Sequence, residues 1–130
     1  MFVNTSWNNH NDSTVAGSGA SWKLKVKTPA AGGPYTINIK SRNNILLENV
    51  LIGEVWVCSG QSNMEMNYNW GIKSMAAEIP TAFNNNIRFF QIPKTTAANP
   101  QDDVKAGWAV CDSNTVKAFS AVGYFFGKKL

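Results

Sequence analysis

Ser62 is the residue of this sequence that is best placed to do chemistry. It lies in the run Gly60–Met64 (GQSNM), just after Glu54 to Cys58, an apolar segment that we expect to form a strand held in a sheet. Ser59 and Gly60 then allow a sharp turn, which would place the Ser62 hydroxyl at the end of that strand with backbone N–H groups nearby. This arrangement is typical of a serine nucleophile.

A serine nucleophile needs a general base, and His10 is the only histidine of the chain. His10 stands far upstream of Ser62 in the polar stretch Asn8 to Gly19, whose composition is typical of an exposed loop. We interpret His10 as a solvated loop residue, and its use as the base for Ser62 is the less favoured alternative. The sequence thus offers a candidate nucleophile without an evident base.

Two other kinds of hydrolase site are disfavoured by the residues themselves. Met64 stands where the nucleophile elbow of α/β-hydrolases has its second glycine, so Ser62 does not fit that motif. Glu54 and Glu65 could be imagined as the carboxylate pair of a glycoside hydrolase, but nothing in the sequence fixes their separation. We interpret Glu65 as a solvated charge that follows the turn.

The run GQSNM at Gly60–Met64, preceded by GEVW-C at Gly53 to Cys58, resembles the first conserved block of the SGNH (GDSL-like) esterases. The variant is the one found in the sialate O-acetylesterase family. Similarity to that family covers nearly the whole chain, in the segments Ser21 to Ile39, Asn49 to Met66, Ile87 to Pro93, Trp108 to Cys111 and Phe119 to Leu130. The resemblance implies an N-terminal fragment of such an esterase.

The resemblance also implies a role for each residue of the block. Ser62 would be the nucleophile, and its own N–H would be one donor of the oxyanion hole. Gly60, Gln61 and Asn63 would shape the loop and the acyl pocket, because an amide cannot act as a base near neutral pH. In the family the other oxyanion donors come from later blocks, and the catalytic acid and histidine lie near the C-terminal end of a much longer chain. We therefore expect these groups beyond Leu130, and we expect residues 1–130 alone to be inactive.

The reaction implied by the resemblance is hydrolysis of acetyl esters on a sugar such as sialic acid, through a serine acetyl-enzyme and without a metal or organic cofactor. An acetylated carbohydrate is the expected substrate. The missing base leaves an alternative open, in which residues 1–130 are a non-catalytic, β-rich carbohydrate-binding or structural fragment. Trp56, Trp70 and Trp108 could then line a sugar platform, although such side chains more often belong to a core.

Composition excludes several other classes of protein. The chain of 130 residues is long enough for one domain. Hydrophobic residues make up 44% of it and aromatic residues 12%, which is enough for a packed core. The net charge is +4 and the 12 Lys and Arg residues are scattered, so the basic patch of a nucleic-acid-binding protein is missing. No apolar run approaches the roughly 18 residues that span a bilayer, and no signal peptide follows Met1. We expect neither nucleic acid nor a membrane as partner, and the compartment stays open.

The two cysteines, Cys58 and Cys111, are too few to form a metal site of the usual four-ligand kind with one histidine, so we expect no metal. A disulfide between them is arithmetically possible. We favour a free Cys58 that packs as a small hydrophobic residue inside its strand.

Residues 1–52 are expected to form an antiparallel β region, which we interpret as part of a β-sandwich-like lead-in domain. Apolar residues alternate with polar ones in most of it, and turn-forming residues separate the segments. The expected strands are Met1 to Trp7, Trp22 to Lys27, Tyr35 to Lys40 and Ile45 to Ile52. Asn8 to Gly19 is expected to be a polar loop.

Residues 53–130 are expected to form the first strands and helices of an SGNH three-layer α/β/α domain, so the fold class is α/β and the domain is incomplete. The expected strands are Glu54 to Cys58, Ile87 to Ile92 and Trp108 to Cys111, and the expected helices are Tyr68 to Ile79 and Phe119 to Leu130, the latter capped by Ser120. An incomplete sheet would leave an unpaired edge and an uncovered apolar face. We therefore expect the isolated chain to associate with itself.

Overall fold

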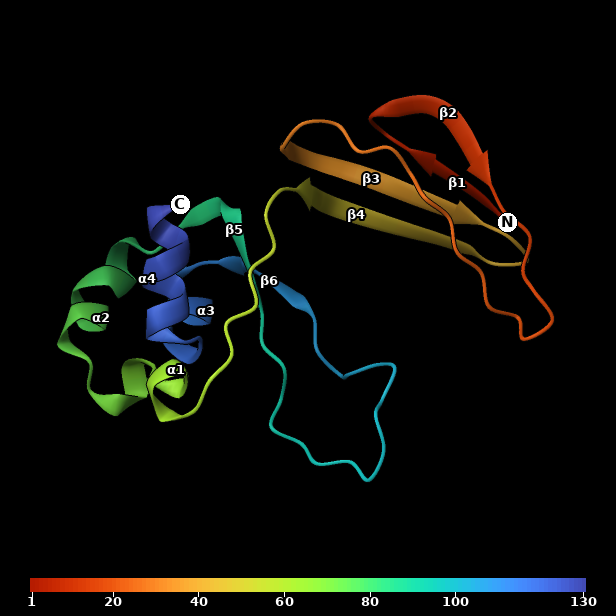
Figure 1. Ribbon diagram of the computed structural model, residues 1–130. Coiled ribbons are helices and arrows are strands. Elements are labelled where there is room, and N and C mark those ends of the chain that lie inside the picture. The colour runs from red at the N-terminus through yellow and green to blue at the C-terminus, as the bar shows by residue number, and fades with distance from the viewer. The chain divides into compact units, whose positions relative to one another are not determined.

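The computed structural model describes residues 1–130, which form two compact units (Figure 1). The N-terminal unit is Met1–Trp56 and holds an antiparallel sheet, whereas the C-terminal unit is Val57–Leu130 and combines short helices with a small sheet. The predicted mixture of α and β structure is confirmed. The division into domains at residues 52 and 53 stays a prediction.

The sheet of the N-terminal unit has four strands in the order β2-β1-β3-β4, and all neighbours are antiparallel. The strands are β1 (Phe2–Thr5), β2 (Asn8–Ser13), β3 (Gly32–Lys40) and β4 (Asn44–Ile52). Val3 of β1 lies between Ile39 of β3 and Asp12 of β2. Val3 and Thr5 are buried, whereas the residues between and before them are exposed, as the two-residue period of a strand requires. The unit contains one sheet, and the sandwich-like arrangement stays a prediction.

Three of the four strands expected in this unit are confirmed, as β1, β3 and β4. The expected loop after Trp7 is wrong in part, because residues 8–13 form β2. Those side chains are polar, but strand pairing uses backbone N–H and C=O groups, which every residue there supplies to β1. Composition alone therefore missed a strand whose pairing is set by its neighbour.

The expected strand Trp22 to Lys27 is also wrong, since these residues have no regular structure. Side chains from other segments take up carbonyl groups of this stretch. Trp7 Nε1 donates to the Lys27 carbonyl at 2.9 Å, and Thr14 Oγ1 donates to the Lys23 carbonyl at 3.3 Å. The alternation of apolar and polar residues is present, but no neighbouring strand pairs with the segment.

The C-terminal unit contains four α-helices, two short 3-10 helices and two strands. In chain order they are α1 (Ser62–Glu65), η1 (Tyr68–Trp70), α2 (Lys73–Glu78), η2 (Ile79–Thr81), β5 (Asn84–Phe90), β6 (Trp108–Cys111), α3 (Ser113–Ala118) and α4 (Ala121–Lys129). β5 and β6 are antiparallel, with Phe89 opposite Ala109. The strands expected at 87–92 and 108–111 are thus confirmed, the first with a shift toward its N-terminus.

The core of this unit forms where the helices pack on β5 and β6. Its buried residues are Met75, Ile79, Ala82, Phe89, Cys111, Val116, Ala121 and Tyr124. The rings of Phe89 and Phe119 are stacked with centroids 4.4 Å apart, and the Tyr124 ring meets Phe89 edge-on. These contacts join the sheet to α4 and fix the helix that lies beside the serine turn.

The expected strand Glu54 to Cys58 is wrong, because no other segment pairs with it. Val55 and Val57 are 73% and 89% exposed. An extended segment without a neighbouring strand cannot form the inter-strand hydrogen bonds of a sheet. The apolar residues alone were therefore not sufficient to make it a strand. Cys58 is consequently exposed and not buried as expected, although both cysteines are free as expected.

The expected helix Tyr68 to Ile79 is broken into η1 and α2 at Gly71, which has a left-handed backbone with φ of 76°. The α3 helix was not expected at all. Its N-terminus is closed by Asp112, whose side chain accepts from the N–H groups of Asn114 and Thr115 at 2.8 Å each. The bond from Thr115, followed by that from Asn114, lowers the pKa of the Asp112 carboxyl.

The expected C-terminal helix is confirmed as α4. Ser120 caps it as predicted, since its Oγ accepts a 3.2 Å hydrogen bond from the N–H of Gly123. The long segment between β5 and β6 is irregular over residues 93–107, also as predicted.

Candidate active site

The serine turn, Ser59–Met64, leads directly into α1, and Ser62 is the first residue of that helix. The carbonyl of Gln61 accepts from the N–H groups of Met64 and Glu65 at 3.0 and 3.1 Å, and the Ser62 carbonyl accepts from Met66 at 3.0 Å. Because the first N–H groups of a helix have no acceptor within it, those of Ser62 and Asn63 remain open. Ser62 itself is exposed.

Gly60 allows the turn to close. A Cβ atom at this position would lie 3.1 Å from the Cβ of Met64, which is closer than nearly all real contacts of this kind. Gly60, Gln61, Ser62 and Asn63 are therefore brought together in one exposed turn, and Gly60 has a steric reason to be a glycine. Their roles in an oxyanion hole or acyl pocket stay predictions.

The segment after Ser62 is held by two other parts of the unit. The N–H of Ala121, at the start of α4, donates to the Met66 carbonyl at 2.8 Å, and Ser120 Oγ lies 3.4 Å from Met64 Sδ. Glu65 forms an ion pair with Lys94 of the irregular segment. The carboxylate considered for glycoside hydrolysis is thus engaged with a surface cation.

No general base lies beside Ser62 in its own unit. The Ser62 hydroxyl makes no hydrogen bond to another residue, and Val57–Leu130 contains no histidine. His10 belongs to the N-terminal unit, where it is exposed as expected, although on β2 and not in a loop, and its Nε2 is 3.9 Å from Asp12 Oδ1. The structure therefore places Ser62 on an exposed turn with no general base beside it.

A second polar cluster, which the sequence did not reveal, joins α2 to α4. Glu78 Oε2 accepts from the Tyr124 hydroxyl at 2.9 Å and from Lys128 Nζ at 2.5 Å. The bonds from Lys128 and Tyr124 lower the pKa of Glu78, whereas burial, followed by the bond to Glu78, raises the pKa of Tyr124 to about 12. The three residues are 46 and 50 positions apart, so no local spacing could have indicated their contact.

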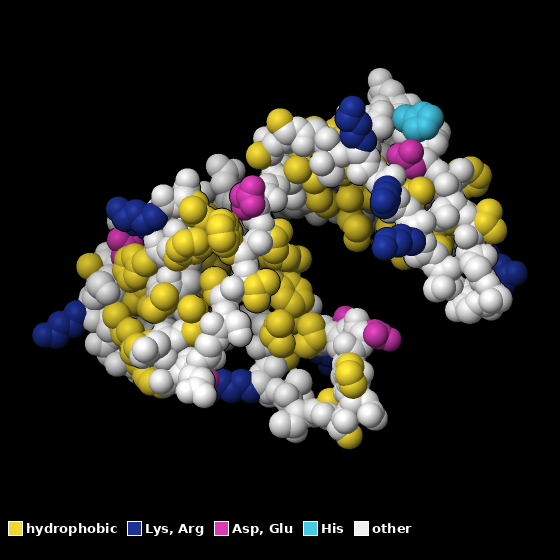
Figure 2. All heavy atoms as spheres, viewed as in Figure 1, with side chains coloured by type: hydrophobic (Ala, Val, Ile, Leu, Met, Phe, Trp, Pro, Cys, Tyr) yellow, Lys and Arg dark blue, Asp and Glu magenta, His cyan; other side chains and the backbone are white.

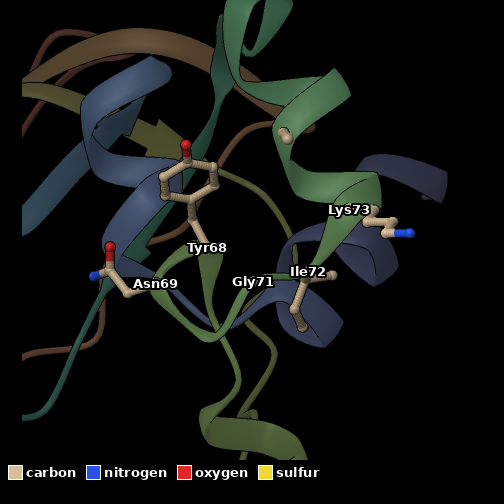
Figure 3. A pocket seen from close by; sticks show the side chains of 6 residues that line it. Tyr68, Asn69, Gly71, Ile72 and Lys73 are labelled. Atoms are coloured by element: carbon tan, nitrogen blue, oxygen red, sulfur yellow. The ribbon is translucent and has the colours of Figure 1, made fainter.

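A hollow of about 430 Å³ lies at η1 and α2. It is lined by Tyr68, Asn69, Gly71, Ile72, Lys73 and Ala76. Figure 3 shows that Tyr68, Asn69 and Lys73 project in different directions, so their polar groups do not converge on one ligand position. Trp70, considered for a sugar platform, is 53% exposed beside it.

Other kinds of site are not found in the chain. No three His, Cys, Asp or Glu side chains gather closely enough to hold a metal ion. None of the helices has the length and apolar character needed to cross a bilayer.

Comparison with known proteins places this site in context. No family model matches the chain. The sialate O-acetylesterase of Rattus norvegicus is 28% identical over 130 residues, which cover 90% of this chain and 24% of the relative. That of Homo sapiens is 27% identical over 122 residues, which cover 84% of this chain and 23% of the relative. This chain thus spans about a quarter of the length of these relatives.

A solved structure agrees with the sequence comparison. The crystal structure of a carbohydrate acetylesterase from Xanthomonas citri matches 99% of this chain and 29% of its own, with a TM-score of 0.90 and 28% identity. The family that the GQSNM block resembles is also the one named by the curated relatives. The chain is therefore similar, in sequence and in fold, to sialate O-acetylesterases and to a carbohydrate acetylesterase.

Proposed function

We propose that this chain supplies the nucleophile of a carbohydrate O-acetylesterase, with Ser62 as the attacking residue. The observation that carries the proposal is the position of Ser62 on an exposed turn at the start of α1, with its hydroxyl and its N–H both open. The relatives are named for the removal of acetyl groups from sialate and other carbohydrates. An acetyl ester on a sugar hydroxyl, such as that of sialic acid, is therefore the proposed substrate.

The proposed reaction proceeds through an acetyl-enzyme. Ser62 Oγ attacks the acetyl carbonyl carbon while a base removes its proton, and the Ser62 N–H donates to the oxygen that becomes negative. The bond from the carbonyl carbon to the sugar oxygen then breaks, and the sugar leaves with a proton. Water next attacks the acetyl-enzyme, which releases acetate and restores the Ser62 hydroxyl.

The other residues of the block would shape this site. Gly60 lets the chain turn tightly against Met64, and Gln61 and Asn63 flank the nucleophile with amide side chains that can donate hydrogen bonds but cannot remove a proton. We assign Gly60, Gln61 and Asn63 to the loop and acyl pocket on this basis.

The base and its supporting acid are proposed to come from outside residues 1–130. This fits the absence of a base beside Ser62 and the share of the relatives that the chain covers. It also fits a C-terminal unit that represents the first part of an SGNH three-layer domain, with a central sheet larger than β5 and β6. On its own, the chain would then show little hydrolysis, because a serine without its base retains only residual catalysis.

The test uses the isolated chain and a chimera. In the chimera, residues 1–130 replace the matching 29% of the Xanthomonas citri acetylesterase, which supplies the rest of an esterase. We expect the isolated chain to release almost no acetate from an O-acetylated sialic acid and the chimera to release it readily. Ser62→Ala should lower the chimera's rate by at least about a thousandfold, whereas Ser59→Ala, in the same turn, should not. An active Ser62→Ala chimera would overturn the assignment.

A second candidate function is carbohydrate binding without turnover, which is favoured by the missing base. It predicts that the isolated chain binds O-acetylated sialic acid, as measured by calorimetry or saturation-transfer NMR, and that Ser62→Ala leaves both binding and any hydrolysis unchanged. Ser62-dependent hydrolysis by the chimera would exclude this alternative as the function of the block.

A further inference from the structure

The segment that carries Ser62 contacts the first turn of α4 on both sides of the serine. No strand holds the segment before Ser62, because Glu54 to Cys58 is part of neither sheet, and α1, which begins at Ser62, has only four residues. An isolated helix of one turn is unstable by itself. Some other element must therefore fix the conformation of the serine turn.

On the C-terminal side of the serine, the contact is made by hydrogen bonds. Ala121 N–H donates to the Met66 carbonyl at 2.8 Å, and Ser120 Oγ lies 3.4 Å from Met64 Sδ, within reach of a weak O–H···S bond. Met66 in turn donates its N–H to the Ser62 carbonyl at 3.0 Å. A short chain of bonds thus connects α4 to the peptide group of the serine.

On the N-terminal side, the contact is steric. A Cβ at Gly123 would lie 3.3 Å from Cys58 Sγ and 3.1 Å from a ring carbon of Phe119. Cys58 therefore packs directly on the backbone of α4, four residues before Ser62. Gly127, one helical turn later, faces open space and has no such neighbour.

The α4 helix is itself well fixed in the unit. Ser120 closes its first turn by accepting from Gly123 N–H, Tyr124 is buried against Phe89, and Glu78 binds both Tyr124 and Lys128. A fixed helix that contacts both flanks of a short turn restricts the turn between them.

We propose that Ser120 and Gly123 are positioning residues that set the conformation of the serine turn. The proposal rests on the proposed function in that Ser62 is the residue to be positioned. Ser120 acts through Met64, and Gly123 acts by letting Cys58 approach the helix. Neither residue is assigned a contact with substrate.

The first test compares two glycines of the same helix in the 130-residue chain. We expect Gly123→Ala to raise the amide hydrogen-exchange rates of residues 64–66, whose N–H groups donate to the Gln61 and Ser62 carbonyls, by at least about tenfold, because the new methyl group crowds Cys58. Gly127→Ala adds the same methyl group to the same helix and is the matched control. It should leave these rates unchanged, because Gly127 faces open space. Combining Gly123→Ala with Cys58→Ala should restore part of the protection. Equal exchange in the two single variants would overturn the role of Gly123.

The second test separates the two functions of Ser120. Ser120→Thr keeps the cap and the donor to Met64, Ser120→Asp keeps only the cap, and Ser120→Ala keeps neither. We expect Thr to preserve, and Asp and Ala to shift, the NMR signal of the Met64 methyl group and the amide exchange of residues 64–66. The thermal midpoint of the Asp variant should stay close to that of the wild type. A wild-type methyl signal in the Asp variant would show that Ser120 is only a helix cap and would overturn its positioning role.

These readouts are independent of hydrolysis. If the chimera with Ser62→Ala stays active, the proposed function fails, and the exchange data still report whether α4 holds the turn. If amide exchange at residues 64–66 is insensitive to both sets of variants, the positioning proposal fails even when Ser62 proves to be the nucleophile.

Discussion

The hydroxyl of Tyr124 donates a 2.9 Å hydrogen bond to Glu78, a residue 46 positions earlier in the chain. Tyr124 lies in α4 and Glu78 ends α2, so the bond ties together two helices that both follow the serine turn in sequence. Because Lys128 also binds Glu78, the carboxylate is held as an anion, and the neutral form of Tyr124 is favoured beside it.

The ionisation of Tyr124 is expected near pH 12. Burial and the bond to Glu78 raise the pKa of its hydroxyl from 10.0 to about 12, so the stabilisation that it provides is fully present below pH 10.0 and is lost between these two values. The difference in phenolate absorbance between the wild type and Tyr124→Phe measures this transition. A midpoint close to 10 in the difference titration would contradict the prediction.

Glu78 is expected to stabilise the folded chain only at pH values at which its carboxylate is ionised. Its pKa is lowered in the folded chain from the ordinary value of 4.5, so its contribution is present above that pH and lost as the pH falls through the folded value. Glu78→Gln should therefore lower the urea midpoint at pH 7, and the difference should narrow toward pH 3. Glu48→Gln, at an exposed residue of β4, is the matched control and should leave the urea midpoint unchanged at both pH values.

Val116→Ala should destabilise the C-terminal unit by about 2 kcal/mol, because Val116 is fully buried and the lost methyl groups leave a cavity. The exposed Val122 of α4 provides the control, and Val122→Ala should stay within about 0.5 kcal/mol. Urea unfolding followed by tryptophan fluorescence measures both. Similar losses for the two variants would show that α3 is not packed in this core.

Gly71→Ala should cost about 1 kcal/mol of stability through the backbone alone. Gly71 has φ of 76° and no atom would meet an added Cβ, so the cost comes from the left-handed conformation and not from a clash. Gly71→Asn should cost less, because asparagine tolerates this region better. Gly107→Ala, at an equally open position without positive φ, is the control for the added methyl group.

Self-association of the isolated chain is expected to depend on its exposed apolar side chains. Figure 2 shows hydrophobic atoms over much of one face of the C-terminal unit, and Ile92 and Trp108 of this unit are 68% and 62% exposed. Ile92→Lys should lower the sedimentation coefficient at high protein concentration. Gln91→Lys adds the same charge at the neighbouring exposed residue and should have a smaller effect. A wild-type chain that stays monomeric at all concentrations would refute this expectation.

Segments with a local signal were predicted well from the sequence. β3 and β4 follow from alternating apolar residues around turns, and the Ser120 cap of α4 follows from one residue before an apolar helix. The GQSNM block, a short and specific pattern, pointed to the same family that the similar proteins are named for. These features depend on neighbours in the chain.

Features that depend on distant partners were missed. Glu54 to Cys58 has the composition of a strand but no segment to pair with, whereas β2 has a polar composition and pairs with β1. The contacts of Ser120 with Met64 and of Tyr124 with Glu78 cross 56 and 46 residues. Only the folded chain brings such residues together, so residue spacing could indicate the candidate nucleophile but not its contacts with α4.

The position of residues 54–58 outside both sheets also makes the two cysteines chemically distinguishable. Cys58 is exposed, whereas Cys111 is 1% exposed and burial raises the pKa of its thiol. A thiol-specific fluorophore or spin label is therefore directed to Cys58 in the native chain. Since Cys58 packs against Gly123 of α4 and stands four residues before Ser62, such a label can report the motion of the serine turn without any engineered cysteine.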